Sequence, residues 1–227
     1  MKLNFSVKYL LAFIPLVFLM GETHELVHTS VGRLICGCWG VRDFNVWGLC
    51  GGCKENYPAL STLATFAGPI YSFILVWVGY FMLGKEKSDN SKAWGISLIA
   101  ANILFARILT AGISGGDEVY GLRMLFDSRY VAWILGLAIV LILSIPPLVR
   151  VYKNIKNQKK ILWFIGLLLI PFIIAMIGAM TLNPLLKNGF LDEVWVMGSP
   201  RIITYWLVFN LLAFLIFYRN IRLINKY

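Results

Sequence analysis

Six long runs of apolar residues, separated by short and mostly polar stretches, dominate the pattern of this 227-residue chain. Each run approaches the roughly 20 residues that an α-helix needs to cross the hydrocarbon core of a bilayer. We therefore predict an all-α polytopic membrane protein with about six transmembrane helices. Their approximate ranges are 9–31, 58–83, 94–113, 130–149, 161–180 and 202–218. The first run lacks a small-residue cleavage site, so we interpret it as an uncleaved span rather than a signal peptide.

Composition supports one membrane domain and leaves no room for a separate soluble one. Hydrophobic residues make up 59% of the chain and charged residues 14%, against about 25% charged in an average soluble domain. We treat residues 1–227 as a single integral membrane domain whose surroundings are the lipid bilayer. The net charge of +10 sits in short connecting segments, which indicates membrane orientation and not a nucleic-acid partner.

Lysine and arginine are unevenly divided between the two sets of connecting segments. Thirteen lie on the side that holds both termini, and seven lie on the other side. Because basic residues are enriched on the cytoplasmic side, we predict that both termini are cytoplasmic. The thirteen are Lys2, Lys8, Lys85, Lys87, Lys92, Arg150, Lys153, Lys156, Lys159, Lys160, Arg219, Arg222 and Lys226. The seven are Arg33, Arg42, Lys54, Arg123, Arg129, Lys187 and Arg201, and Arg107 falls inside the third run.

The most specific motif is the H-E-x-x-H at His24–His28, near the end of the first apolar run. Residues four apart lie on one face of a helix, so the imidazoles of His24 and His28 can bind one zinc ion. Glu25 lies beside that face and can act as the general base toward a metal-activated water. The motif predicts one catalytic Zn²⁺. The alternative is a pair of polar side chains lining the interior of a helix bundle.

The chain has no histidine besides these two. This excludes the histidine-rich di-iron enzymes of membranes, and it means that a third protein ligand must be a carboxylate or a thiolate. The first and third runs cross the bilayer in the same direction, so their ends meet at one face. A turn at Gly115-Gly116 follows the third run and can bring Asp117 toward the histidines. Asp117 is our predicted third ligand and Glu118 the second choice. A solvated turn is the alternative.

All four cysteines lie between the first two runs, as Cys36-Gly37-Cys38 and Cys50-Gly51-Gly52-Cys53. They could form disulfides on an exported side, bind a structural metal in the cytosol, or be unrelated thiols. Between the pairs, residues 41–49 carry valine, phenylalanine and tryptophan bounded by glycines. This pattern is compatible with a short β-strand or hairpin whose edge could pair with an extended peptide.

Three segments in this order give the chain a resemblance to the site-2 protease family of intramembrane zinc metalloproteases. They are HELVH at 24–28, AGPIYSF at 67–73, and the run with Asn102 that leads to the glycine-rich turn at Asp117. The resemblance implies a metalloprotease core at 9–125 with additional transmembrane helices at 126–227. It also implies zinc bound by His24, His28 and Asp117, Glu25 as the catalytic base, and a transmembrane protein as substrate. Asn102 would then help to orient that substrate.

The chain departs from this family in two ways, and other classes remain open. Gly-Gly-Asp-Glu at 115–118 replaces the Asp-Gly order usual in the family, and the charge distribution places the site nearer the exported side. One alternative is another class of membrane metalloprotease, which cuts soluble or lipidated peptides and uses a glutamate as third ligand. The others are a membrane metal transporter and a non-catalytic scaffold.

Overall fold

The computed structural model describes residues 1–225, which fold into helices without a β-sheet. Six helices in this range are long and apolar enough to cross a membrane, which confirms the prediction of about six long apolar helices. They are α1 (Val7–Cys36), α3 (Pro58–Met82), α4 with α5 (Asp89–Ala101 and Leu104–Gly112), α7 (Arg129–Asn154), α8 (Lys160–Lys187), and α9 with η2 (Arg201–Phe217 and Tyr218–Ile224). The short elements α2 (Cys53–Asn56), α6 (Asp117–Arg123) and η1 (Val196–Gly198) lie in the connections.

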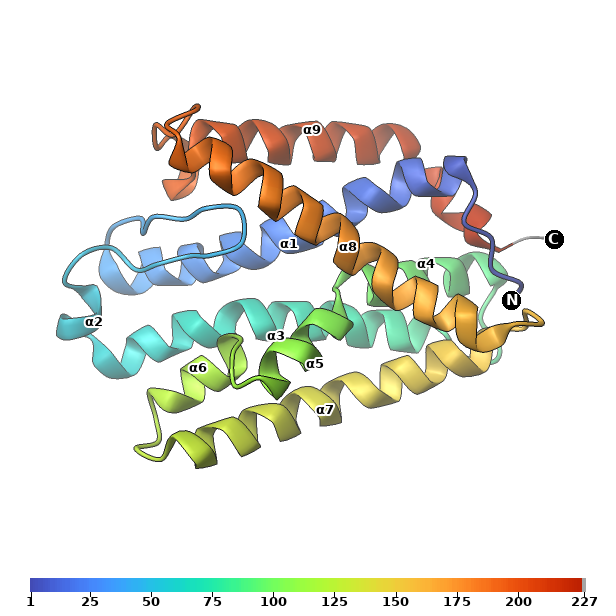
Figure 1. The fold of residues 1–227 in the computed structure, drawn as a ribbon, viewed down its shortest axis with the longest axis horizontal. Coiled ribbons are helices and arrows are strands. Elements are labelled where there is room, and N and C mark those ends of the chain that lie inside the picture. The colour runs from blue at the N-terminus through green and yellow to red at the C-terminus, as the bar shows by residue number, and fades with distance from the viewer. Residues whose placement is uncertain (226–227) are drawn as a thin grey trace.

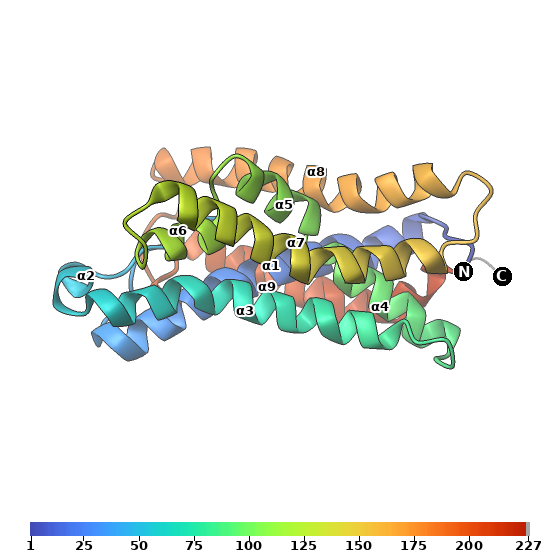
Figure 2. The same cartoon turned by 90° about the horizontal axis from the view of Figure 1, so that it is seen from below.

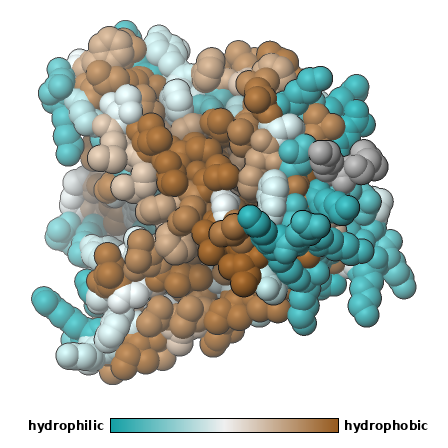
Figure 3. All heavy atoms as spheres, turned by 45° about the vertical axis from the view of Figure 1, so that its right-hand side comes forward, coloured by the Kyte–Doolittle hydropathy of each residue, from teal (hydrophilic) through white to brown (hydrophobic). Residues whose placement is uncertain are grey.

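The spans form an elongated bundle with two distinct ends (Figures 1 and 2). The N-terminus, the end of η2 and the connections after α3 and α7 lie at one end, which we call the terminal end. The connection after α1, the helix α6 and the connection before α9 lie at the other, the loop end. Hydrophobic side chains cover the middle of the face in Figure 3, and hydrophilic ones gather toward the ends. This belt is what a bilayer requires of a spanning bundle.

The two ends also separate the basic residues of the charge count. The larger set comes from segments at the terminal end and the smaller set from segments at the loop end. Lys226, which belongs to the larger set, lies outside the described residues. Successive spans run in opposite directions, so the two sets of basic residues lie at opposite ends of the bundle, as the predicted orientation assumes.

Helix α1 is longer than the apolar run predicts. Ser6 caps its N-terminus by accepting a hydrogen bond from the Tyr9 backbone N–H, and Gly37 ends it with φ +76°. The positive φ is a conformation that glycine adopts without steric cost. Because the helix continues to Cys36, His24 and His28 lie about three and two turns before its C-terminus, firmly within helical structure.

The sequence predicts one continuous helix for the third span, but the structure has two helices there, α4 and α5. Helix α4 ends at Ala101, Asn102 is its C-cap, and Ile103 has φ +50°. A positive φ is rare for a β-branched residue and marks a locally strained backbone. After this break α5 leads into the turn that brings the chain back to α6 (Figure 1). The break therefore precedes the segment that carries Asp117.

Helices α3 and α4 cross closely toward the terminal end because two glycines face each other. A Cβ on Gly79 would lie 2.9 Å from the Gly95 carbonyl oxygen, and one on Gly95 would lie 2.6 Å from the Gly79 carbonyl oxygen. Such distances leave no room for a side chain, so this crossing depends on both glycines. Small residues at a crossing are a common device of membrane helix packing.

The connection after α1 is a loop held by two disulfide bonds. Cys36 pairs with Cys53, and Cys38 pairs with Cys50 inside that closed ring. Between them, Asp43 and Val46 form a tight turn, and Arg42 and Trp47 make a single isolated antiparallel bridge. The structure therefore does not show the β-strand or hairpin considered for residues 41–49. Of the three possibilities considered for the cysteines, the structure has disulfides. We call residues 37–52 the disulfide loop.

Candidate metal centre

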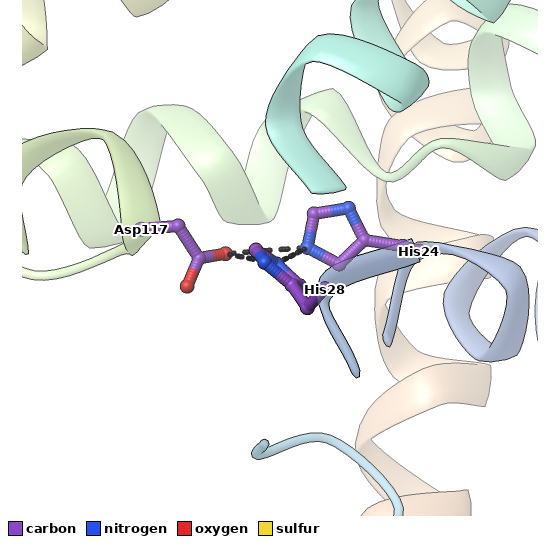
Figure 4. Close-up of side chains that lie close together, drawn as sticks. All are labelled: His24, His28 and Asp117. Atoms are coloured by element: carbon purple, nitrogen blue, oxygen red, sulfur yellow. Dashed lines mark hydrogen bonds and ion pairs between the residues drawn. The ribbon is translucent and has the colours of Figure 1, made fainter. Parts of the chain in front are cut away.

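The side chains of His24, His28 and Asp117 lie close together where α1 meets the start of α6 (Figure 4). His24 and His28 project from one face of α1, and Asp117 is the first residue of α6. The Nε2 atoms of the two imidazoles lie 3.0 Å apart, and Asp117 Oδ2 lies 3.2 Å from His24 Nε2 and 3.5 Å from His28 Nε2. Three potential ligand atoms thus converge on one point.

The triangle formed by these atoms has the size of a tetrahedral zinc site. Zinc binds imidazole nitrogen and carboxylate oxygen at about 2.0–2.2 Å, so two ligands of a tetrahedral ion lie about 3.3 Å apart. The observed sides of 3.0, 3.2 and 3.5 Å bracket that value. Two histidines and one carboxylate are a donor set of catalytic zinc sites, which keep the fourth position for water or substrate. The residues present therefore fit a metal ion.

The hydrogen bond of His28 favours the tautomer that a metal needs. His28 is fully buried, and its Nδ1 lies 2.7 Å from the carbonyl oxygen of Ala64 on α3. A carbonyl oxygen only accepts, so the proton of a neutral imidazole must be on Nδ1. The lone pair of Nε2 is then free and points at Asp117 and His24. Such an outer partner commonly orients a metal-binding histidine.

His24 has two polar neighbours, and only one proton arrangement around it suits a metal. Its Nδ1 lies 3.0 Å from Ser72 Oγ and 2.9 Å from Arg107 Nη2. If Nδ1 donates to Ser72, the Nε2 lone pair is free for an ion, and Arg107 Nη2 donates to the same hydroxyl at 3.0 Å. If Arg107 donates to Nδ1 instead, Nε2 carries the proton and donates to Asp117. Metal binding therefore requires the first arrangement.

Gly68 of the Ala-Gly-Pro segment explains how α3 can approach both histidines. A Cβ on this residue would overlap His28 Nε2 and would lie 2.7 Å from His24 Cε1. Ala64, Gly68 and Ser72 are spaced by four residues and therefore share one face of α3. That face supplies a carbonyl acceptor, empty space and a hydroxyl group to the two imidazoles. Helix packing alone does not account for this glycine.

The structure separates the two candidates for the third ligand. Asp117 lies against the imidazoles, whereas Glu118 Oε1 accepts a hydrogen bond from Arg107 Nη1 at 2.9 Å. Asp117 Oδ2 is therefore the carboxylate oxygen that faces the Nε2 atoms of both imidazoles, and Glu118 is directed to Arg107 instead. The Glu118–Arg107 ion pair fixes α6 against α5.

Glu25 and Asn102 lie on cavities that meet at the triad. A cavity of about 530 Å³ separates the disulfide loop from α3 and α6, and another of about 290 Å³ lies beside the break between α4 and α5. Glu25 and Asp117 line both cavities. Among the described residues, Glu25 Oε2 has no hydrogen-bond partner. Asn102 lines the smaller cavity and donates to the Leu98 carbonyl oxygen.

Sequence reasoning missed three contributions to this site. The Ala64 carbonyl group, Ser72 and the ring of Trp47 all contact a histidine. The small residues at 64, 68 and 72 are a four-residue repeat that could have indicated a close approach of α3. Trp47 offers no such signal, because its position depends on how the disulfide loop folds back. Arg107, which falls inside the third apolar run, pairs with Glu118.

Comparisons with protein-family models, with curated proteins and with solved structures found no match to this chain. The site is accordingly interpreted from its own geometry.

Proposed function

We propose that this chain is an intramembrane zinc metalloprotease that hydrolyses peptide bonds in or near transmembrane segments. The observation that carries the proposal is the triangle of His24 Nε2, His28 Nε2 and Asp117 Oδ2, whose sides of 3.0–3.5 Å suit a tetrahedral ion. Glu25 follows His24 directly in the chain and lines the cavities beside the triad. This is the position from which the motif's glutamate can reach a metal-activated water.

In the proposed mechanism each residue has one task. His24, His28 and Asp117 hold the zinc ion, which when bound supplies Lewis-acid activation of water and of the peptide carbonyl group. Glu25 takes a proton from the attacking water and then gives it to the nitrogen of the leaving amine. Its buried position, without another hydrogen-bond partner in residues 1–225, leaves the carboxylate available for both transfers.

The substrate in this proposal is a transmembrane protein whose chain unwinds locally to enter the larger cavity. That cavity reaches Glu25 and Asp117 and is bounded by the disulfide loop, so a peptide bound in it would lie beside the metal ligands. Asn102 is 6% exposed and lines the smaller cavity on the other side of the triad. We assign it the role of orienting the substrate, on the grounds of this position.

We further propose that both termini are cytoplasmic and that the metal site lies nearer the exported side. The unequal count of basic residues favours this orientation. The disulfides favour it independently, because such bonds persist in oxidising compartments and are rare in the cytosol. His24 lies about 26 Å along α1 from its first residue, which places it beyond the middle of a core of about 30 Å.

The core beneath the site favours an enzyme over a metal carrier. Between the triad and the terminal end, α1 buries Phe13, Leu16 and Val17 in a hydrophobic cluster with residues of α3 and α4. A carrier needs polar groups along a path through the membrane. In the described part of the chain, this apolar cluster interrupts any such path. Metal flux into vesicles containing the protein would contradict the proposal.

The test of the chemistry is the substitution Glu25→Gln. We expect this variant to keep its metal while cleavage of a single-span membrane protein falls by at least about 1,000-fold, because the amide cannot accept the proton. The wild type and a Glu86→Gln variant, whose exposed carboxylate lies in the connection between α3 and α4, serve as controls. Unchanged proteolysis in Glu25→Gln would refute the mechanism.

A further inference from the structure

One face of the imidazole of His28 is covered by an aromatic ring from outside the membrane spans. The Trp47 indole stacks on it with a centroid separation of 4.5 Å and an angle of 10° between the planes. Trp47 belongs to the disulfide loop and also lines the larger cavity. The ring of His24 lies nearly perpendicular to that of His28. The stacked indole is therefore the contact that limits how far the plane of the His28 imidazole can tilt.

The disulfide loop is fixed to α1 at both of its ends. The Cys36–Cys53 bond joins the last residue of α1 to the start of α2, and the Cys38–Cys50 bond closes a smaller ring within it. Trp47 lies inside that smaller ring. The indole is therefore presented to His28 by a short and doubly crosslinked segment rather than by a free loop.

A buried ion pair fixes the middle of the same loop. Arg42 Nη2 donates to Glu22 Oε2 at 2.8 Å, and both side chains are almost completely buried. Glu22 lies two residues before His24 on α1, and Arg42 Nε also donates to Ser199 Oγ at 2.7 Å. A buried pair that loses one partner leaves an uncompensated charge. The pair thus specifies how the loop sits on the metal-binding helix.

Close backbone packing completes the attachment. A Cβ on Gly32, one turn beyond His28, would lie 3.0 Å from Leu49 Cδ2. Within the loop, a Cβ on Gly40 would overlap the Gly48 carbonyl oxygen. The loop therefore touches α1 at positions 22, 28 and 32, which surround the metal-binding motif.

We infer that Trp47, presented by the disulfide loop, is a positioning residue for the ligand His28. This inference rests on the proposed metal site. A metal on Nε2 withdraws electron density from the imidazole, and the electron-rich face of an indole attracts an electron-poor ring. The stack therefore stabilises the metal-bound form more than the free form. It also holds the ring plane along the line to the metal.

The test measures the dissociation constants of Zn²⁺ and Co²⁺ for the purified full chain. Trp47→Leu keeps an apolar side chain but removes the ring, and we expect metal to bind about 3- to 10-fold more weakly. Trp47→Phe keeps a stacking ring and should restore affinity to within about 2-fold of the wild type. Trp39→Leu, in the same loop but half-exposed, should bind metal as the wild type does.

A spectrum separates positioning from general loss of structure. The visible bands of bound Co²⁺ report the geometry of its ligands, so they should change in Trp47→Leu and not in Trp39→Leu. If Trp47→Leu does not fold, a Cys38→Ser/Cys50→Ser variant, which frees the inner ring but keeps the indole, should weaken metal binding to a similar degree.

The outcomes distinguish this inference from the proposal beneath it. A wild type that binds no metal refutes the proposed function. A wild type that binds metal, together with a Trp47→Leu variant of unchanged affinity and unchanged Co²⁺ spectrum, overturns the role of Trp47 alone. Equal weakening in Trp47→Leu and Trp39→Leu would also overturn it, because the effect would then belong to the loop as a whole.

Discussion

The first three spans and the last three differ in what they bury. Half or more of the most apolar stretch of α1, of α3 and of α4–α5 is buried, against 28% or less in α7, α8 and α9. Yet α7 and α8 are the most apolar of the six spans. In a bilayer, lipid contact demands apolar side chains as strongly as a protein core does. Among these spans the two of highest hydropathy, α7 and α8, are thus among the least buried, as a lipid-facing position requires.

The polar residues follow the same division. Every side chain of the metal triad and its hydrogen-bond partners comes from α1, from α3, or from the segment between α4 and α6. The later spans add packing. For example, α9 runs beside α1, and Trp206 on α9 stacks edge-on against Phe18. Polar side chains buried in the most enclosed helices are costly and mark function. The candidate metal centre therefore belongs to the first half of the chain.

The largest expected effect belongs to Gly68 on α3. Gly68→Ala places a methyl group where His28 Nε2 lies, so we expect metal affinity to fall by more than about 100-fold, as when a ligand itself is displaced. Gly21→Ala is the matched control, because a Cβ there meets nothing within 4 Å. Calorimetric titration with Zn²⁺ measures both. Equal affinities would mean that α3 does not need this close approach.

The next effect distinguishes two adjacent carboxylates. Asp117→Asn removes the charge that faces both imidazoles, and we expect at least about 100-fold weaker metal binding. Glu118→Gln only weakens the pair with Arg107, so a loss of about 10-fold or less is expected. The same titration ranks the two variants. The reverse order would move the third ligand by one position.

Substitution of Gly79, at the other end of α3, should have a smaller effect, and that effect should be on stability rather than on metal affinity. Its substitution by alanine crowds the crossing with α4, where a Cβ would lie 2.8 Å from Ile99 Cγ1. We expect a loss of about 1–3 kcal/mol in stability with metal affinity unchanged. Thermal unfolding in detergent, beside a zinc titration, checks both. A loss of metal affinity would show that the two ends of α3 are coupled.

The smallest effect is expected on the lipid face of the second half. Ile177 on α8 is 60% exposed, and Ile177→Val removes one methylene group from a surface that lipid covers. Because the substitution creates no internal cavity, the free energy of unfolding should change by less than about 0.5 kcal/mol. A larger loss of thermal stability would indicate that α8 has a protein neighbour at this position.

The six long apolar helices and the shared face of His24 and His28 follow from the sequence because they depend on local patterns. Apolar runs report spans, and two histidines four apart report a shared helix face. The break at Ile103 is not readable in this way, because no glycine or proline at 101–104 marks it. The pairing of Cys36 with Cys53 is one of three possible connectivities. The contact between Trp47 and His28 arises only once that loop is closed.

The part played by Gly68 illustrates the same limit. In the sequence it belongs to a stretch of small residues that suits any helix crossing. Only the structure shows that the space it leaves is filled by the imidazole of a predicted metal ligand. Long-range meetings of this kind decide the site, and a local pattern can indicate only one side of them.

The most direct test of the central claim is the metal content of the purified protein, measured by elemental analysis. We predict about one zinc per chain in the wild type and in Glu25→Gln, and little in His24→Ala, because the histidine is a ligand and the glutamate is not. Absence of metal from all three proteins, even after incubation with Zn²⁺, would contradict the account and leave the motif as a packing feature of the bundle.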